Sequence, residues 1–83
     1  MCYYLTMILI DVRTKGEYEG GHIEGAIHHD IMDMMQGKFP DINKDEDISL
    51  YCESGNRSMM AKQFMNNAGF KNVTDKGSID NLR

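Results

Sequence analysis

Two short apolar runs, each followed by a signal for the start of a helix, constrain the fold of this chain more than any other feature. Leu5 to Val12 is long enough for a strand buried on both faces and too short for a helix of its own. Ile48 to Tyr51 is a second such run, and it stops abruptly at Cys52. Strands that alternate with helices pair in parallel through right-handed crossovers. The sequence therefore predicts an α/β fold, a parallel sheet with helices on both faces.

Capping residues and apolar periodicity mark the helices. Thr14 and Glu17 match a capping box, and Asp30 is a good N-cap. Gly69 ends a run of apolar residues with helical spacing. The predicted helices cover about residues 15–19, 31–36 and 57–68. Two further strands are expected at 26–28 and 72–74, and a last helical turn within 77–82.

Length and charge limit the domain count and the classes of partner. Because 83 residues support one hydrophobic core, residues 1–83 are expected to form a single domain. The net charge of −4, with scattered lysines and arginines, gives no positive surface for a nucleic acid. Met7 to Ile10 is too short an apolar stretch to cross a membrane. No signal peptide is recognisable, so we expect a cytoplasmic protein in which Cys2 and Cys52 are free thiols.

Cys52 is the candidate nucleophile. It lies at the carboxyl end of a predicted parallel strand and just before a helix, where unpaired amides and the helix dipole favour a thiolate. Ser54 and Gly55 allow the backbone amides of residues 53–58 to point at one centre above the sulfur. Arg57 is expected to close this ring with a fixed positive charge. Such a cradle suits a persulfide anion or the anionic end of a sulfur donor.

Five segments resemble signatures of the single-domain rhodanese, or thiosulfate sulfurtransferase, family and occur in the family's order. They are LIDVRT (9–14), EY (17–18), GHIEGAI (21–27), YCESGNRS (51–58) and AGFKNV (68–73). The resemblance implies a rhodanese-like three-layer α/β fold with a central, mainly parallel sheet and a persulfide on Cys52. It also implies that the sulfur is recognised by the amides of Glu53, Ser54, Gly55, Asn56, Arg57 and Ser58.

Three departures from the family pattern stand out. The chain begins close to the strand at Leu5, where the family usually has an earlier strand and helix, so we expect a fold trimmed at the N-terminus. Gly77-Ser78 and Leu82 stand where the family often has a glycine pair and a closing aromatic residue. The segment 28–30 replaces a more apolar stretch that contains proline.

These features predict a sulfurtransferase that works by a ping-pong reaction. The Cys52 thiolate takes the outer sulfur of thiosulfate or a similar donor, and a thiol or cyanide acceptor then removes it. Arg57 is expected to orient the donor, with side-chain hydrogen bonds from Ser54 or Asn56. Neither a metal nor an organic cofactor is required. We expect a monomer or weak dimer, with a protein as a possible sulfur acceptor.

The residues around Cys52 also carry expectations. Asp11 is expected to line the site or to bond the amides of the loop, and Arg13 to pair with Glu17. Glu53 is expected to face solvent, because a carboxylate turned toward the thiolate opposes its ionisation. His22 is expected to fix the shape of its loop through a hydrogen bond.

His28 and His29 are neighbours on a short predicted strand. Successive side chains of a strand point to opposite faces, so these two histidines cannot chelate one ion. We therefore expect no metal site at this pair.

Two alternative functions remain open at this stage. A cysteine followed by a loop, an arginine and a helix is also typical of phosphatases and related arsenate reductases. However, only four residues separate Cys52 from Arg57, one fewer than tyrosine phosphatases use, which favours a sulfur atom. The second alternative is a sulfur-carrier or regulatory module that delivers sulfur to a protein partner.

Overall fold

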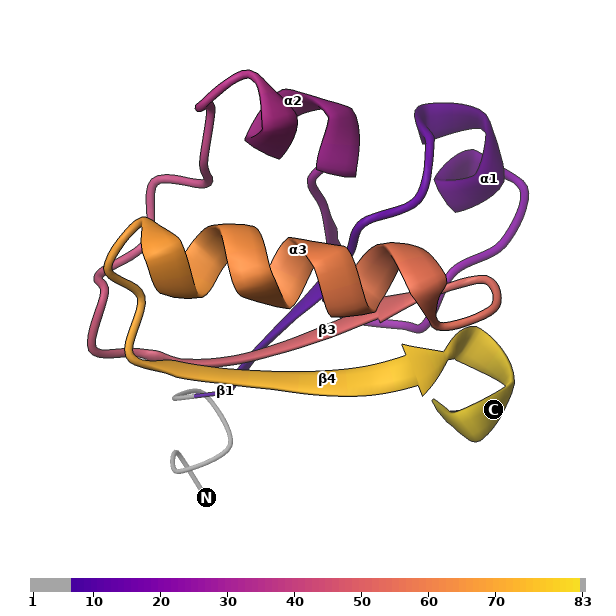
Figure 1. The fold of residues 1–83 in the computed structure, drawn as a ribbon. Helices are drawn as coiled ribbons and strands as arrows, with labels where there is room; N and C mark the ends of the chain where they lie inside the picture. Colours follow the sequence, from indigo (N-terminus) through magenta and orange to yellow (C-terminus); the bar gives the residue numbers. More distant parts are fainter. Residues whose placement is uncertain (1–6, 83) are drawn as a thin grey trace.

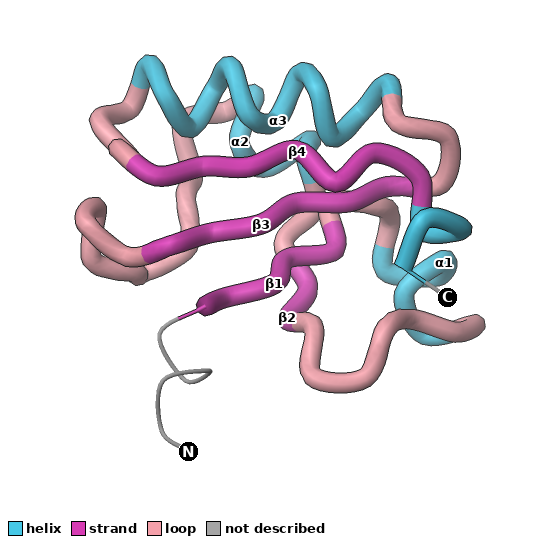
Figure 2. Tube along the Cα trace, turned by 90° about the horizontal axis from the view of Figure 1, so that it is seen from below, coloured by secondary structure: helices cyan, strands magenta, loops and turns pink. Residues whose placement is uncertain are grey.

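The sheet of this protein has four parallel strands. The computed structural model describes residues 7–82. The strands are β1 (Met7–Asp11), β2 (Ile27–His28), β3 (Asp47–Cys52) and β4 (Asn72–Ser78). They lie in the order β2-β1-β3-β4, and every neighbouring pair is parallel (Figures 1 and 2). The predicted α/β fold with a parallel sheet is confirmed, while residues 5 and 6 of the first predicted strand lie outside the described residues.

The helices are α1 (Lys15–Glu19), α2 (Ile31–Met35), α3 (Asn56–Asn67) and the 3-10 helix η2 (Ile79–Leu82). Helices α1 and α2 begin at the residues that their caps predict, and α3 begins one residue before its predicted start. Thr14 and Glu17 form both hydrogen bonds of the capping box, and the Asp30 carboxylate accepts from the amide of Met32. None of the helices within residues 7–82 has the length and apolar character needed to cross a membrane.

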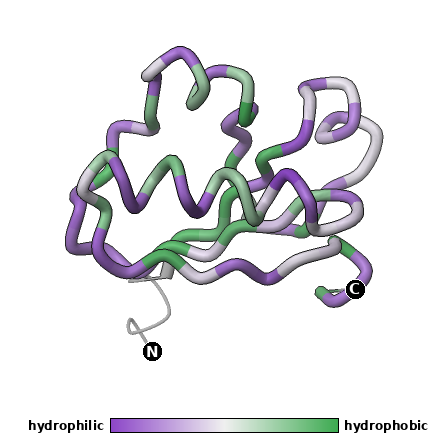
Figure 3. The backbone as a smooth tube through the Cα atoms, viewed as in Figure 1, coloured by the Kyte–Doolittle hydropathy of each residue, from purple (hydrophilic) through white to green (hydrophobic). Residues whose placement is uncertain are grey.

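The two faces of the sheet are covered differently. Helices α2 and α3 lie on one face, and α1 and η2 lie at the end where the strands have their carboxyl termini (Figure 1). On the α2 and α3 face, Ala61 and Met65 of α3 pack into the larger core cluster. On the other face, Ala26, Tyr51 and Ile79 form a small cluster. The hydrophobic colour in Figure 3 accordingly runs along the central strands. On this face the sheet packs against the 3-10 helix η2 and the loop that contains Ala26, and not against a long helix.

Strand β4 contains a bulge beside Cys52. Leu50 pairs with Asp75 and Cys52 pairs with Ser78, so β4 has one residue more than β3 over this interval. Gly77 takes a positive φ of 79° here, a conformation that glycine adopts without a steric penalty. A bulge bends the strand and redirects its side chains. The strand predicted at 72–74 is too short, since β4 continues to Ser78. The prediction ended early because Asp75, Lys76 and Gly77 are residue types that are depleted in strands.

The buried methionine of α3 allows a direct test of this core. Met65→Ala removes a side chain with no exposed surface and is expected to lower the free energy of unfolding by about 2–4 kcal/mol. Met60→Ala, on the exposed side of the same helix, is expected to change it by less than about 0.5 kcal/mol. Urea denaturation measures both, and equal effects of the two substitutions would contradict the packing described here.

Candidate active site

Cys52 is the last residue of β3, and its side chain is fully buried where that strand meets the loop leading to α3. The loop is short, because α3 already begins at Asn56. Gly55, the residue before α3, has a φ of 100°, which allows the chain to turn from strand to helix in three residues. The thiol therefore lies at the carboxyl edge of a parallel sheet and at the amino end of a twelve-residue helix.

Hydrogen bonds from the loop converge on the sulfur. The Gly55 amide donates to Cys52 Sγ over 2.9 Å. The amides of Ser54 and Ser58 also interact with the sulfur, and Ser58 Oγ lies 3.5 Å from it. Of the six predicted amides, the structure thus places those of Ser54, Gly55 and Ser58 against the sulfur. The side chains of Ser54 and Asn56, which were expected to reach the donor, are exposed to solvent.

These hydrogen bonds determine how readily the thiol ionises. Burial opposes the charged form and by itself raises the pKa of the Cys52 thiol. The hydrogen bond between the sulfur and the Ser58 side chain, together with the three amides, outweighs burial, so this pKa lies below its ordinary value. The loop therefore favours a thiolate, as the sequence analysis predicted.

Asp75 is a neighbour of the site that the sequence analysis missed. The Ser58 hydroxyl donates to Asp75 Oδ1 over 2.7 Å, and the Gly77 amide donates to the same oxygen over 2.8 Å. Ser58 thus connects the Cys52 sulfur to a carboxylate on the neighbouring strand. Asp75 pairs with Leu50 and lies two residues after Val73, so strand alternation places it on the face that α3 covers. The strand predicted from the sequence ends at Thr74 and therefore does not include Asp75.

Arg57 makes a contact that the sequence did not predict, although its charge still interacts with Cys52. Its guanidinium makes a bidentate ion pair with Glu17 of α1, with distances of 2.7 and 2.9 Å. Both side chains are about one-third exposed. The Arg57 guanidinium lowers the pKa of Glu17 to about 2, so this carboxylate is charged at neutral pH.

Arg13 does not pair with Glu17, so the predicted ion pair between these two residues is wrong. Its guanidinium is buried and makes a 2.7 Å ion pair with the carboxylate of Asp11. It also donates to Glu53 Oε1 over 2.9 Å and to the carbonyl oxygen of Gly21 over 2.7 Å. Arg13 therefore ties the first strand to the loop after Cys52.

Asp11 is buried beneath the surface as the partner of Arg13 and is not exposed for contact with a substrate. Its side chain has no exposed surface, and both carboxylate oxygens accept from Arg13. Burial works against ionisation, but the hydrogen bonds from Arg13 prevail and lower the pKa of Asp11. The predicted contact between Asp11 and the substrate or the loop amides is replaced by this buried pair.

Glu53 is half exposed, as expected, but it is held by Arg13 and does not extend freely into solvent. The Ser78 hydroxyl donates to the Glu53 carbonyl over 2.8 Å. Gly55 lies against Gly77, whose Cα is 3.7 Å from the position of a Cβ at Gly55. Gly77 and Ser78, which depart from the family pattern, thus pack directly against the loop.

The histidines lie outside the loop. His22 Nδ1 lies 2.7 Å from the Tyr18 carbonyl oxygen and its ring stacks on Tyr18, which confirms that it fixes the shape of its loop. His28 bonds the carbonyl of Arg13, whereas His29 bonds the carbonyl of Lys38. Each of these two histidines therefore binds a different backbone group.

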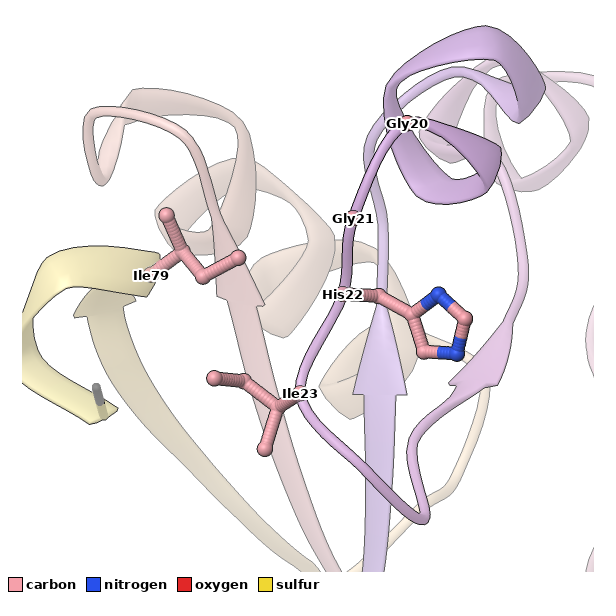
Figure 4. Close-up of a pocket in the computed structure, with 5 residues that line it drawn as sticks. All are labelled: Gly20, Gly21, His22, Ile23 and Ile79. Atoms are coloured by element: carbon pink, nitrogen blue, oxygen red, sulfur yellow. The ribbon is translucent and has the colours of Figure 1, made fainter.

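A pocket of about 350 Å³ opens beside the active-site loop. It is lined by Gly20, Gly21, His22, Ile23 and Ile79. In Figure 4 the side chains of Ile23 and Ile79 approach each other across the pocket, while the His22 ring points away from Ile79. Ile79 directly follows Ser78, the residue paired with Cys52, so the pocket adjoins the strand ends that carry the thiol.

Comparisons with known proteins agree on one family. The rhodanese-like domain profile matches residues 4–79. The chain is 28% identical over 76 residues to the thiosulfate sulfurtransferase PspE of Escherichia coli, covering 88% of this chain and 71% of PspE. It is 37% identical over 65 residues to the putative sulfur carrier protein YrkF of Bacillus subtilis, covering 78% of this chain and 35% of YrkF.

A solved structure shows the same fold. The human single-domain sulfurtransferase TSTD1 superposes with a TM-score of 0.84 at 17% identity, covering 96% of this chain and 83% of that one. At this identity the similarity establishes the fold alone. The chain spans about a third of the length of YrkF and as little as 15% of another curated relative.

The ionisation of Cys52 can be measured directly. In a Cys2→Ser background, where Cys52 is the only thiol, the rate of alkylation by iodoacetamide is expected to rise with pH about a midpoint below the ~8.5 of a free cysteine. Ser58→Ala removes a hydrogen bond to the thiolate, so the midpoint is expected to move upward. An unchanged midpoint in this variant would show that the hydroxyl does not stabilise the thiolate.

The buried Asp11–Arg13 pair is expected to contribute to stability. Asp11→Asn leaves a buried guanidinium without its main counter-ion and is expected to cost about 3 kcal/mol in the free energy of unfolding. Asp45→Asn removes the same charge from an exposed pair with Lys71 and is expected to cost less than about 1 kcal/mol. Chemical denaturation compares the two, and similar losses would argue against a structural role for the buried pair.

Proposed function

The chain belongs to the rhodanese-like domain family of sulfurtransferases, and we propose that it transfers a sulfane sulfur through a persulfide on Cys52. The donor is thiosulfate or a similar sulfane compound, and the acceptor is a thiol or cyanide. The hydrogen bond from the Gly55 amide to Cys52 Sγ carries this proposal, because a backbone amide that donates to this sulfur favours negative charge on it.

Loading begins with attack of the Cys52 thiolate on the outer sulfur of the donor. A new S–S bond forms between Sγ and this sulfur, while the original S–S bond breaks. In thiosulfate the electron pair of the broken bond leaves with sulfite. The product on the protein is a persulfide anion, and no proton is needed in this half-reaction.

Unloading returns the thiolate. The acceptor attacks the outer sulfur of the persulfide, the S–S bond to Cys52 breaks, and its electron pair returns to Sγ. With cyanide the product is thiocyanate. A thiol acceptor first gives its proton to water and then leaves as a persulfide.

The loop amides act in both steps. The amides of Ser54, Gly55 and Ser58 stabilise charge on Sγ, which makes it both a reactive thiolate and a good leaving group. We assign the remaining amides of the loop, those of Glu53, Asn56 and Arg57, to the outer sulfur. The Ser58 side chain of α3 shares a further hydrogen bond with the sulfur, 3.5 Å between Sγ and Oγ.

Transfer to a protein partner is the second candidate function. The relative YrkF is named a putative sulfur carrier protein, and the same persulfide could be delivered to a protein cysteine. This alternative shares the loading step and differs only in the acceptor. A phosphatase or arsenate reductase is the weaker alternative, because the loop from Cys52 to Arg57 is one residue shorter than tyrosine phosphatases use.

The loading step can be observed by intact mass spectrometry. After incubation with thiosulfate, the protein is expected to gain the mass of one sulfur atom, and added cyanide should remove it with formation of thiocyanate. Cys52→Ser should abolish both signals, whereas Cys2→Ser should keep both. A mass gain that survives in Cys52→Ser would contradict the proposal, and hydrolysis of an aryl phosphate without thiocyanate formation would favour a phosphatase.

A further inference from the structure

The charges around the loop suggest which class of donor it takes. Resting on the proposed Cys52 persulfide, we propose that Glu17 is a built-in counter-ion for Arg57 that selects the donor. With Arg57 neutralised, the site takes sulfur from a thiol persulfide, R–S–SH, in preference to the thiosulfate dianion.

The ion pair between Arg57 and Glu17 occupies the site where an anionic donor would bind. Two guanidinium nitrogens meet two carboxylate oxygens at 2.7 and 2.9 Å, the same fork that would hold a sulfonate group. Thiosulfate must therefore displace Glu17 or approach Arg57 while this carboxylate stays in place. Either route weakens the binding of a dianion.

Glu17 is anchored and stays charged. Its Oε1 atom also accepts from the amide and hydroxyl of Thr14, at 3.0 and 3.1 Å, through the capping box of α1. The pKa of Glu17 is about 2, chiefly because of Arg57. At neutral pH the carboxylate thus remains beside Arg57 as a fixed negative charge.

Arg13, a second arginine near the loop, is also held in ion pairs. Arg13 is only 3% exposed, and its guanidinium bonds to Asp11, Glu53 and the Gly21 carbonyl. Asp75 adds a further carboxylate behind Ser58. These contacts bring two guanidiniums and four carboxylates to the surroundings of the loop. The fixed charge there opposes the arrival of a dianion more than that of a neutral or singly charged donor.

The adjoining pocket suits the organic part of such a donor. Among residues 7–82 its lining consists of Gly20, Gly21, His22, Ile23 and Ile79, and none of these described residues is a carboxylate, lysine or arginine. Thiosulfate has no organic group to place there. A thiol persulfide has one, and burial of its carbon atoms against Ile23 and Ile79 would contribute to binding.

The transfer from a thiol persulfide balances without a further reagent. Cys52 Sγ attacks the outer sulfur of R–S–SH, the bond between its two sulfurs breaks, and the electron pair leaves on R–S⁻. The transferred sulfur keeps its proton or loses it to water. The thiolate and a neutral thiol persulfide together carry one negative charge, whereas the thiolate and thiosulfate together carry three.

Glu17→Gln separates the charge of this residue from its structural role. Glutamine is also accepted at the third position of a capping box, so α1 keeps its cap while Arg57 loses its counter-ion. Glu19→Gln is the matched control, because it removes the same charge from the same helix at an exposed pair with Lys15. The probes are thiosulfate and the persulfide of 2-mercaptoethanol, whose organic group carries no charge. The measurement is the second-order rate constant for loading one sulfur onto Cys52.

The unmodified protein is expected to load faster from the persulfide of 2-mercaptoethanol than from thiosulfate. Glu17→Gln should raise the thiosulfate rate constant about fivefold, while the persulfide rate constant and both rates of Glu19→Gln stay within about twofold. The proposal is overturned if thiosulfate is the better donor, or if Glu17→Gln fails to raise its rate or lowers both rates together. Loading of Cys52 by neither donor would instead refute the proposed function itself.

Discussion

The hydrogen bond from the Gly55 amide to the Cys52 sulfur is the interaction on which the rest of the site depends. It requires a strand that ends at the cysteine, a residue with positive φ and a helix that begins at once. The parallel sheet supplies the strand end, and Gly55 supplies the turn. Because burial alone would keep this thiol protonated, the amides of the loop are what make a buried cysteine reactive.

Two ion pairs fix the loop relative to the first third of the chain. Arg13 reaches forward from the end of β1 to Glu53, and Arg57 reaches back from α3 to Glu17 of α1. The pairs thus cross between segments that are forty residues apart in sequence. This arrangement holds the loop in shape and also leaves both guanidiniums occupied. The same contacts that preorganise the site therefore limit its attraction for highly charged donors.

The sequence predicts the elements well where local chemistry determines them. Thr14 and Asp30 locate the starts of α1 and α2, and the cysteine, the glycine and the helical period of α3 locate the site. It fails where a contact joins distant segments. An arginine just before a helix and four residues from a glutamate in its first turn is an attractive local pair, so the sequence favours Arg13 with Glu17. The fold offers each arginine a better-placed carboxylate, and Asp75 reaches Ser58 because β4 extends beyond the predicted strand and places Asp75 on the face covered by α3.

The central claim is that Cys52 carries a sulfur atom held by the amides of its loop. A crystal structure of the protein soaked with a sulfane donor tests it most directly. The account predicts density for one additional sulfur bonded to Cys52 Sγ, within hydrogen-bond distance of backbone N–H groups of residues 53–58. An unmodified Cys52, or an added sulfur directed away from those amides, would contradict it.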